Sequence, residues 1–381
     1  MSSRTFVNQL VFFFMSSQKK AKRIVIIHDN LASSVVQDST SIPNAESYIF
    51  EPTTAFSILS RIIFMESGKF LLIPKELGAD DKKFNDPIEI PCLEGNFSKE
   101  ISEFINYQRQ FVQSSVGFLN NTCRLIDGIF LDLLAEKRNR MIWAIGPLHQ
   151  IIHSKNTEYY NSNNNGKHKC LLEWLDKQEP NSVLYISFGT TTSIGDHDEQ
   201  LQELAIGLEL SETKFIWVFR DADHKKDNGK RVELPEGFEE RMRAKGIGMV
   251  VRDWAPQLEI LEHKSTGGFL SHCGWNSCLE SISYGVPIAT WPMHTDQPTN
   301  ALLITKVLKV GLNVKEWERR HELVSSSTIN KALRRLMGPD EGAEMRKRAQ
   351  DLGAKVRNAT ADGGVSRLEC DSFIAHITRQ T

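Results

Sequence analysis

Short apolar runs alternate with amphipathic segments along most of this chain. The first run, residues 24–27, is β-branched and is closed by His28 and Asp29, which predicts a buried strand. A shorter apolar stretch follows at Met141–Ile145, and beyond residue 170 the alternation becomes regular. Further strands are expected at Val183–Phe188, Phe215–Phe219, Met249–Val251, Gly267–Ser271 and Ile288–Trp291.

Helical periodicity separates these strands. Leu201, Leu204, Ala205 and Leu208 recur at i, i+3, i+4 and i+7, which is typical of a helix with one buried face. Further helices are expected at 98–115, at 276–284 with Gly285 as its cap, at 300–310, and from residue 326 onward. Such alternation predicts an α/β fold with parallel sheets covered on both faces, where ligands bind at the carboxyl ends of the strands.

Two polar or irregular segments suggest the domain boundaries. Residues 149–169 are polar and contain Asn161, Asn163, Asn164 and Asn165 next to Gly166, which is typical of a linker. The apolar burst at 10–15 is too short to span a bilayer, and the basic residues after it reverse the order of a signal peptide. We therefore expect a leader (1–22), an N-terminal domain (23–148), a linker (149–169), a C-terminal domain (170–361) and a final helix (362–381).

Composition narrows the class of partner. The 381 residues are 40% hydrophobic and carry a net charge of −2, so no overall field favours nucleic acid or an anionic membrane. The six cysteines are scattered without a CxxC pair, which indicates reduced thiols in a cytoplasmic protein and no metal framework. A small molecule is the expected partner, with no stable membrane insertion.

The strand and turn at residues 269–277 are the first candidate for chemistry. Gly274 would let the backbone approach a ligand, and N–H groups at a helix start favour an anion such as phosphate. A structural explanation is equally open, because Asn276 could be an N-cap and Ser277 with Glu280 could form a capping box. A second glycine turn follows the strand at 183–188, where Gly189 precedes three threonines.

Neither the motifs that are absent from the sequence nor any single residue decides whether these turns bind a phosphate or only cap a helix. No GxxxxGK is present, and no GxGxxG follows a strand, which disfavours P-loop and dinucleotide-binding proteins. Trp254, Trp275, Trp291 and His272 are each more often core or rim residues than ligand contacts. Taken together, however, the stretch from Trp254 to Gln297 resembles, without a gap, the 44-residue signature box of plant UDP-sugar-dependent glycosyltransferases.

The resemblance extends well beyond the box. It includes SVLYISFGT, LEWLDKQEP and DGGVSRLECDSFIAHI, and covers the chain from about Arg23 to its end. Within the family, IVIIHD, IPNAESYIF, IPCLEGNFS and WPMHTDQPTNA look most like the zeatin O-glycosyltransferases, which modify a cytokinin side-chain hydroxyl. It implies the GT-B fold: two Rossmann-like domains facing each other across a cleft, with the final helix packed back on the first.

The resemblance also assigns a role to each residue that matches the box. Trp254 would stack on uracil, and the backbone of Ala255 would read its edge. Gln257 and Glu280 would bind the ribose hydroxyls. The diphosphate would be held by His272, Asn276, Ser277 and Thr190. The sugar would contact Trp275, Asp296 and Gln297, and a glutamine at the end of the box is usually associated with glucose donors.

The implied reaction is inverting transfer of a sugar, most simply glucose, from a UDP-sugar to a hydroxyl of a small acceptor such as zeatin. UDP leaves, and no metal or other cofactor is required. The family supplies an acceptor-side histidine base oriented by an aspartate. Asp29 matches that aspartate, whereas the histidine has no counterpart, because the strand-helix units expected before Arg23 are absent.

We therefore expect an N-terminal domain that is shorter by about three βαβ units, or roughly 100 residues. His28 is not expected to replace the base, since neighbouring strand residues point to opposite faces. Two alternatives to an active transferase stay open: a UDP-binding protein without transfer, and an unstable fragment with an exposed sheet edge.

Overall fold

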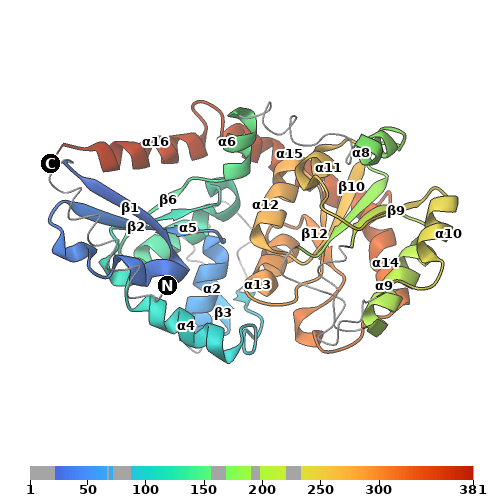
Figure 1. The fold of residues 1–381 in the computed structure, drawn as a ribbon, viewed down its shortest axis with the longest axis horizontal. Helices are drawn as coiled ribbons and strands as arrows, with labels where there is room; N and C mark the ends of the chain where they lie inside the picture. Colours follow the sequence, from blue (N-terminus) through green and yellow to red (C-terminus); the bar gives the residue numbers. More distant parts are fainter. Residues whose placement is uncertain are drawn as a thin grey trace. The chain divides into compact units, whose positions relative to one another are not determined.

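The structure is a computed structural model, and it describes residues 22–66, 68–71, 87–155, 169–189, 198–219 and 233–380. The chain divides into two compact units. The first comprises residues 1–62, 94–148 and 359–381, and the second comprises 63–93 and 149–358. Each unit contains a parallel sheet with helices on its faces (Figure 1), which is the α/β architecture that the strand pattern predicts.

The first unit is built on a four-stranded sheet in the order β1-β2-β5-β6, with every neighbouring pair parallel. These strands are β1 (Ile24–Asp29), β2 (Ala45–Glu51), β5 (Gly117–Asn120) and β6 (Met141–Ala144). The accompanying helices are η1 (Asn30–Val36), η2 (Ser39–Ser41), α2 (Ala55–Met65), α4 (Lys99–Arg109), η4 (Val112–Ser114), α5 (Arg124–Arg138) and α16 (Val365–Thr378).

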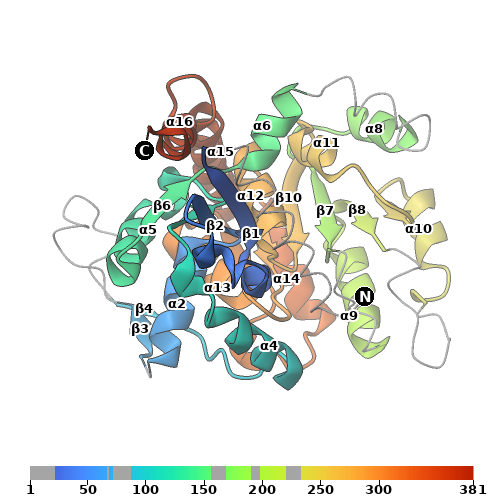
Figure 2. The same ribbon diagram turned by 60° about the vertical axis from the view of Figure 1, so that its left-hand side comes forward.

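Helices from distant parts of the chain cover the two faces of this sheet. On one face, the rings of Tyr48 and Trp143 each lie 5.2 Å from Phe373 of α16, which runs beside β6 (Figures 1 and 2). On the other face, the guanidinium of Arg138 in α5 lies 4.0 Å from the ring centre of Phe118. The C-terminal helix is therefore part of the first unit.

The second unit contains a six-stranded parallel sheet in the order β9-β8-β7-β10-β11-β12. Its strands are β7 (Val183–Ser187), β8 (Lys214–Val218), β9 (Gly248–Val251), β10 (Thr266–Ser271), β11 (Ile288–Thr290) and β12 (Gly311–Asn313). Counted from β7, this is the 3-2-1-4-5-6 order of a Rossmann sheet. The order reverses between β7 and β10, and ligands of such sheets bind beside that point.

Helices lie before, between and after the strands of this second sheet along the chain. They are α6 (Leu148–Lys155), α8 (Lys169–Asp176), α9 (Asp198–Ser211), α10 (Phe238–Ala244), α11 (Gln257–Glu262), α12 (Trp275–Tyr284), α13 (Gln297–Leu302), η7 (Leu303–Val307), η8 (Trp317–Arg319), α14 (Ser326–Met337) and α15 (Glu341–Ala359). A short antiparallel pair, β3 (Phe70–Leu71) and β4 (Ile88–Glu89), also belongs to this unit.

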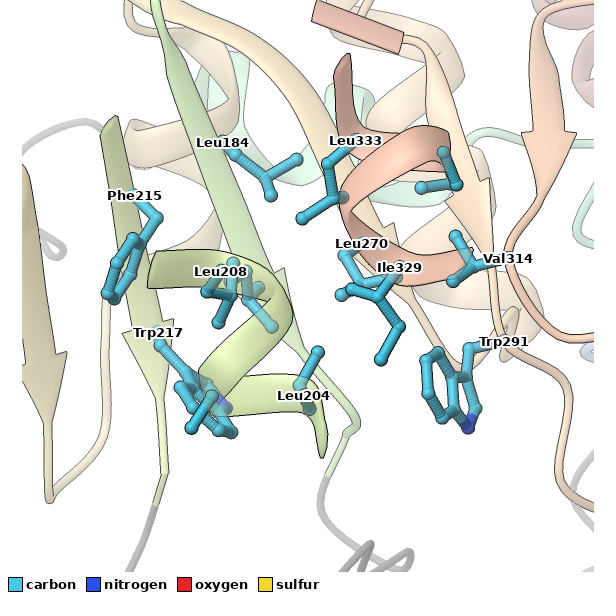
Figure 3. Packing of buried hydrophobic residues seen from close by; sticks show 14 of the residues in the cluster. Leu184, Leu204, Leu208, Phe215, Trp217, Leu270, Trp291, Val314, Ile329 and Leu333 are labelled. Atoms are coloured by element: carbon cyan, nitrogen blue, oxygen red, sulfur yellow. The ribbon is translucent and has the colours of Figure 1, made fainter. Parts of the chain in front are cut away.

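Alternate residues of the buried strand β7 belong to two different cores, because successive side chains point to opposite faces. Leu184 packs in a cluster with residues of α9 and α14, among them Leu208 and Leu333 (Figure 3). Tyr185 belongs to a second cluster with residues of α8 and α11. Burial on both faces explains why the strand reads as a continuous apolar run.

Some predicted boundaries differ from the structure. Of the predicted linker 149–169, residues up to 155 form helix α6, while 156–168 lie outside the described residues, as does the predicted leader up to residue 21. Residues 63–93, predicted within the N-terminal domain, group with the second unit. The helix predicted at 300–310 begins earlier, at Gln297, where Asp296 is the N-cap and Pro298 lies in the first turn. None of the described helices is both long and apolar enough to cross a membrane.

A buried carboxyl in the first unit predicts a pH dependence of stability. Asp127 of α5 is fully buried and accepts hydrogen bonds from Thr122 Oγ1 and the backbone N–H of Ala55, both at 2.9 Å. Burial raises its pKa from 3.8 to about 6 in spite of these bonds. Between these values the folded state binds more protons than the unfolded state, so stability falls as pH rises through this range.

We therefore expect the free energy of unfolding to fall less between pH 4 and pH 7 in Asp127→Asn than in the unsubstituted chain. The expected difference between the two falls is about 1–2 kcal/mol. The measurement is the free energy of unfolding by urea at both pH values. Asp132→Asn, on the exposed side of the same helix, serves as the control. If the free energy of unfolding changed with pH by the same amount in Asp127→Asn and in the unsubstituted chain, the raised pKa of Asp127 would be contradicted.

Candidate functional site

Two turns meet at the point where the strand order of the second sheet reverses. One follows β7 and contains Gly189, whose φ is +80°; the other follows β10 and contains His272 and Gly274. A Cβ on Gly189 would lie 2.7 Å from His272 Nε2, and one on Gly274 would lie 2.5 Å from the same atom. The imidazole is therefore held between two positions that admit no side chain.

The second turn is fixed by polar contacts from a neighbouring helix. Cys273 has a φ of +68°, its N–H donates to Ser271 Oγ at 3.1 Å, and its carbonyl accepts from Asn300 Nδ2 at 3.0 Å. The same Nδ2 donates to Asp296 Oδ2 at 3.0 Å. Asn300, on α13, thus ties the end of β10 to the start of its own helix, and it is a residue that sequence reasoning did not single out.

The start of α12 differs from both capping arrangements considered above. The helix begins at Trp275, and its N-cap is Gly274, which has no side chain to accept from the first turn. Asn276 and Ser277 lie inside the helix, so neither the N-cap at Asn276 nor the capping box is formed. Neither of the two side-chain caps is therefore present, and a helix N-terminus without a capping side chain faces the turn.

His272 is set up to bind as a neutral group. Its side chain is 7% exposed, and burial lowers its pKa to about 4, with the nearby His294 acting in the same direction. Its Nδ1 is buried without a hydrogen-bond partner. The nitrogen that lies at the two glycine turns is Nε2, so this atom, and not the buried Nδ1, is the one that a polar ligand group at the turns would meet.

The two residues predicted to bind the ribose lie together. Gln257, the first residue of α11, donates through Nε2 to Glu280 Oε2 at 2.5 Å and to Ser277 Oγ at 3.1 Å. Its Oε1 accepts from the hydroxyl of Tyr185 at 3.2 Å. Burial raises the pKa of Glu280, whereas the bond from Gln257 acts in the opposite direction. The arrangement presents a carboxylate whose position is fixed by a neighbouring amide.

The predicted aromatic contacts differ in exposure. Trp254, on the connection between β9 and α11, is 59% exposed, and Ala255 beside it is 5% exposed. An exposed indole can offer its flat face to a planar ligand. The side chain of Trp275 is only 3% exposed and lies in the core, so the group that it brings to the turn is its backbone at the first position of α12.

The remaining predicted residues are spread more widely. Gln297 is buried, and its Oε1 accepts from the N–H groups of Met293 and His294 at 2.8 and 3.1 Å, so its amide holds the preceding turn. Thr190 lies outside the described residues. Among the residues that are described, no group of three or more His, Cys, Asp or Glu side chains could hold a metal ion.

Asp29 lies in the first unit, as the last residue of β1. Its Oδ1 accepts from the N–H of Leu31 at 2.7 Å and caps η1. The neighbouring His28 is 7% exposed, with Nδ1 donating to the Asp29 carbonyl and Nε2 lying 3.5 Å from Ser115 Oγ. Burial lowers the pKa of His28, so it is a neutral strand-end residue packed within this unit.

Two family models and several known proteins match this chain. Residues 3–150 match the family model for the glycosyltransferase N-terminal domain, and residues 140–341 match the model for UDP-glucoronosyl and UDP-glucosyl transferases. The chain is 50% identical to a zeatin O-xylosyltransferase of Phaseolus vulgaris, over 96% of this chain and 77% of the relative. It is 49% identical to a zeatin O-glucosyltransferase of Phaseolus lunatus, over 96% and 76%.

Solved structures show the same fold. A transferase from Siraitia grosvenorii in complex with UDP superposes with a TM-score of 0.78 at 28% identity, covering 99% of this chain and 82% of that one. A Medicago truncatula protein complexed with UDP-glucose gives a TM-score of 0.75 at 28% identity, covering 98% and 80%. The chain has the GT-B fold, and it belongs to the plant UDP-glycosyltransferases, close to the zeatin O-glycosyltransferases.

Proposed function

We propose that this chain transfers glucose from UDP-glucose to a hydroxyl of zeatin or a similar cytokinin. The observation that carries the donor half is the convergence of Gly189, His272, Gly274 and the uncapped start of α12 where the strand order reverses. The acceptor half is supported by the 49–50% identity to two zeatin O-glycosyltransferases. One of these relatives is named a xylosyltransferase and the other a glucosyltransferase, so the choice between glucose and xylose as the transferred sugar needs an experiment.

The roles that we propose follow the geometry of the second unit. The exposed face of Trp254 stacks on uracil beside the Ala255 backbone, and the carboxylate of Glu280, held by Gln257, accepts from the ribose hydroxyls. His272 and the first turn of α12, with Asn276 and Ser277, bind the diphosphate. Asp296 and the turn that precedes it face the sugar.

The proposed reaction is a single displacement. The acceptor oxygen forms a bond to the anomeric carbon as the bond from that carbon to the diphosphate oxygen breaks, and UDP leaves with the electron pair. Configuration at the anomeric carbon inverts. Donors at His272 and the α12 N-terminus stabilise the charge that develops on UDP, so the step requires no metal. The hydroxyl proton passes to solvent water, and the Asp29 carboxylate, which matches the family's aspartate, is the acceptor-side group that we expect to assist this transfer.

The test is incubation of the purified chain with zeatin and either UDP-glucose or UDP-xylose, with products identified by mass spectrometry and the anomer by NMR. We expect an O-glucoside with inverted configuration, formed faster than the xyloside. A faster xyloside would overturn the choice of sugar. UDP binding by calorimetry without any product would instead indicate a protein that binds the donor but does not transfer it.

A further inference from the structure

The strand that carries Asp29 has a sequence that specifies its register weakly. Strand β1 begins with four β-branched residues in succession, 24–27, and Ile27 is 52% exposed. Among the described residues, β1 lies at the edge of its sheet and pairs with β2 alone. A shift of one residue would exchange similar apolar side chains, so it would cost little packing energy. The same shift would move Asp29 by about 3.3 Å and turn its side chain to the other face.

The hydrogen bonds at the carboxyl end of β1 are mostly local. Asp29 Oδ1 accepts from the N–H of Leu31, and His28 Nδ1 donates to the carbonyl of Asp29. These bonds would move with the strand if it shifted. The contact between His28 Nε2 and Ser115 Oγ, at 3.5 Å, is long for a hydrogen bond. The bonds made by His28 and Asp29 therefore do little to fix the register of β1 against β2.

The amino end of β1 is tied to two other elements by Arg23. Its Nη1 donates to the carbonyls of Ile377 and Arg379, both at 2.9 Å, at the end of helix α16. Its Nε lies 3.7 Å from the carboxylate of Glu46 on β2. The Arg23 side chain is only 10% exposed, so these contacts are largely shielded from water. Figures 1 and 2 show the start of β1 beside the C-terminal end of α16.

The end of helix α16 is in turn fixed on β2. Arg379 Nη2 donates to Glu46 Oε1 at 2.5 Å, and the hydroxyl of Tyr48 donates to the other oxygen of the same carboxylate at 2.7 Å. The ring of Phe373 lies 5.2 Å from that of Tyr48. Because α16 is held on β2 in this way, a residue of β1 that binds the end of α16 is also placed relative to β2.

Arg23 reaches α16 only from the face that this helix covers. Val25, two residues later, packs against the apolar cluster that contains Tyr48 and Phe373. Residues two apart on a strand point to the same face, so Arg23 lies on that face as well. After a shift of one residue, Arg23 would point to the opposite face and lose both carbonyl acceptors.

We propose that Arg23 is a positioning residue, which fixes the register of β1 through the C-terminal end of α16 and thereby places Asp29. The extreme C-terminus of the chain then determines where an acceptor-side group lies. The inference rests on the proposed function in one respect, because the position of Asp29 affects the reaction only if the chain transfers a sugar to an acceptor.

Amide hydrogen exchange measured by NMR tests the register directly. The N–H of Ile24 bonds at 2.8 Å to the segment that leads into β2. Alternate N–H groups of a strand point to the same side, so Ile26 and His28 should also exchange slowly, and the amides between them fast. Arg23→Met keeps the apolar stem but removes the donors, and we expect this contrast to be lost. Arg23→Lys keeps a donor for the carbonyls and should retain most of it.

The matched control is Arg124→Ala. Arg124 of α5 pairs with Glu369 of the same helix α16, so this variant weakens the packing of the helix away from β1 and should keep the contrast. Retention of the contrast in Arg23→Met would overturn the proposal. So would its loss in Arg124→Ala, or equal exchange of both sets of amides in the unsubstituted chain.

The second test measures the consequence of the register for the reaction. In Arg23→Met we expect kcat with zeatin to fall about a hundredfold, because the Asp29 carboxylate is displaced by more than 1 Å. The Kd for UDP should change less than twofold, since UDP is proposed to bind the second unit. An unchanged kcat would overturn the link between Arg23 and Asp29. Absence of product from the unsubstituted chain would instead overturn the proposed function, and the exchange pattern would still decide the role of Arg23 in the register.

Discussion

Glu280→Leu is expected to weaken UDP binding about a thousandfold. The substitution removes the carboxylate that would accept from two ribose hydroxyls, and each charge-assisted hydrogen bond contributes about 1.5–3 kcal/mol. It also takes away the oxygen to which Gln257 Nε2 donates at 2.5 Å, leaving that amide without this partner in a largely buried position. Calorimetric titration of UDP measures the effect.

Two further variants separate this role from a general loss of structure. Glu280→Gln keeps one acceptor oxygen and the side-chain volume, so its affinity should lie between those of the Leu variant and the unsubstituted chain. Glu262→Gln changes an exposed carboxylate on α11 and should bind UDP normally. If Glu280→Leu melts at the same temperature as the unsubstituted chain and still binds UDP with the same Kd, Glu280 does not bind the ribose.

Gly274→Ala is expected to weaken UDP binding about a hundredfold, through the position of His272. The φ of Gly274 is −58°, so the backbone itself tolerates a side chain. The obstacle is the imidazole, since the new Cβ would lie 2.5 Å from Nε2, and a Cβ on Gly189 would also lie only 2.7 Å from this atom. Overpacking of this kind costs about 1–3 kcal/mol and would shift the ring from the diphosphate position.

The matched control is a glycine-to-alanine change inside a helix, at a position with room for a side chain. At Gly128 of α5, the nearest atom to a new Cβ is Arg124 Cβ at 3.9 Å, an ordinary contact. Gly128→Ala should stabilise the fold by about 0.5–1 kcal/mol and leave UDP binding unchanged. Thermal melting and calorimetry of both variants check the prediction, and normal UDP binding by Gly274→Ala would contradict it.

The hydrophobic pattern located five of the six strands of the second sheet to within one residue, whereas the short edge strand β12 was not predicted. Strands β7, β8 and β10 are buried on both faces, and their sequences are therefore continuous apolar runs. Such runs can be recognised in the sequence without knowledge of the fold. Helix starts were less accurate. Asn276 and Ser277 have good capping side chains, yet α12 begins earlier, because the left-handed Cys273 and its contact with Asn300 fix the turn.

Gln297 shows that position in a motif does not by itself determine which atoms a side chain contacts. Its place at the end of the signature box associates it with the sugar, whereas the structure commits its carbonyl to the backbone of the turn before α13.

The sequence by itself determined the α/β class, the positions of β1, β6 and five strands of the second sheet, and membership of the plant UDP-glycosyltransferases, because burial periodicity and a long ungapped motif are local properties of the chain. Only the tertiary structure decided that His272 lies between Gly189 and Gly274, that Gln257 holds Glu280, and that Gln297 faces inward. These contacts join residues from different strands and helices. The free energy that each contact contributes depends on which polar atoms are buried next to one another. The packing of the strands and helices determines which atoms these are.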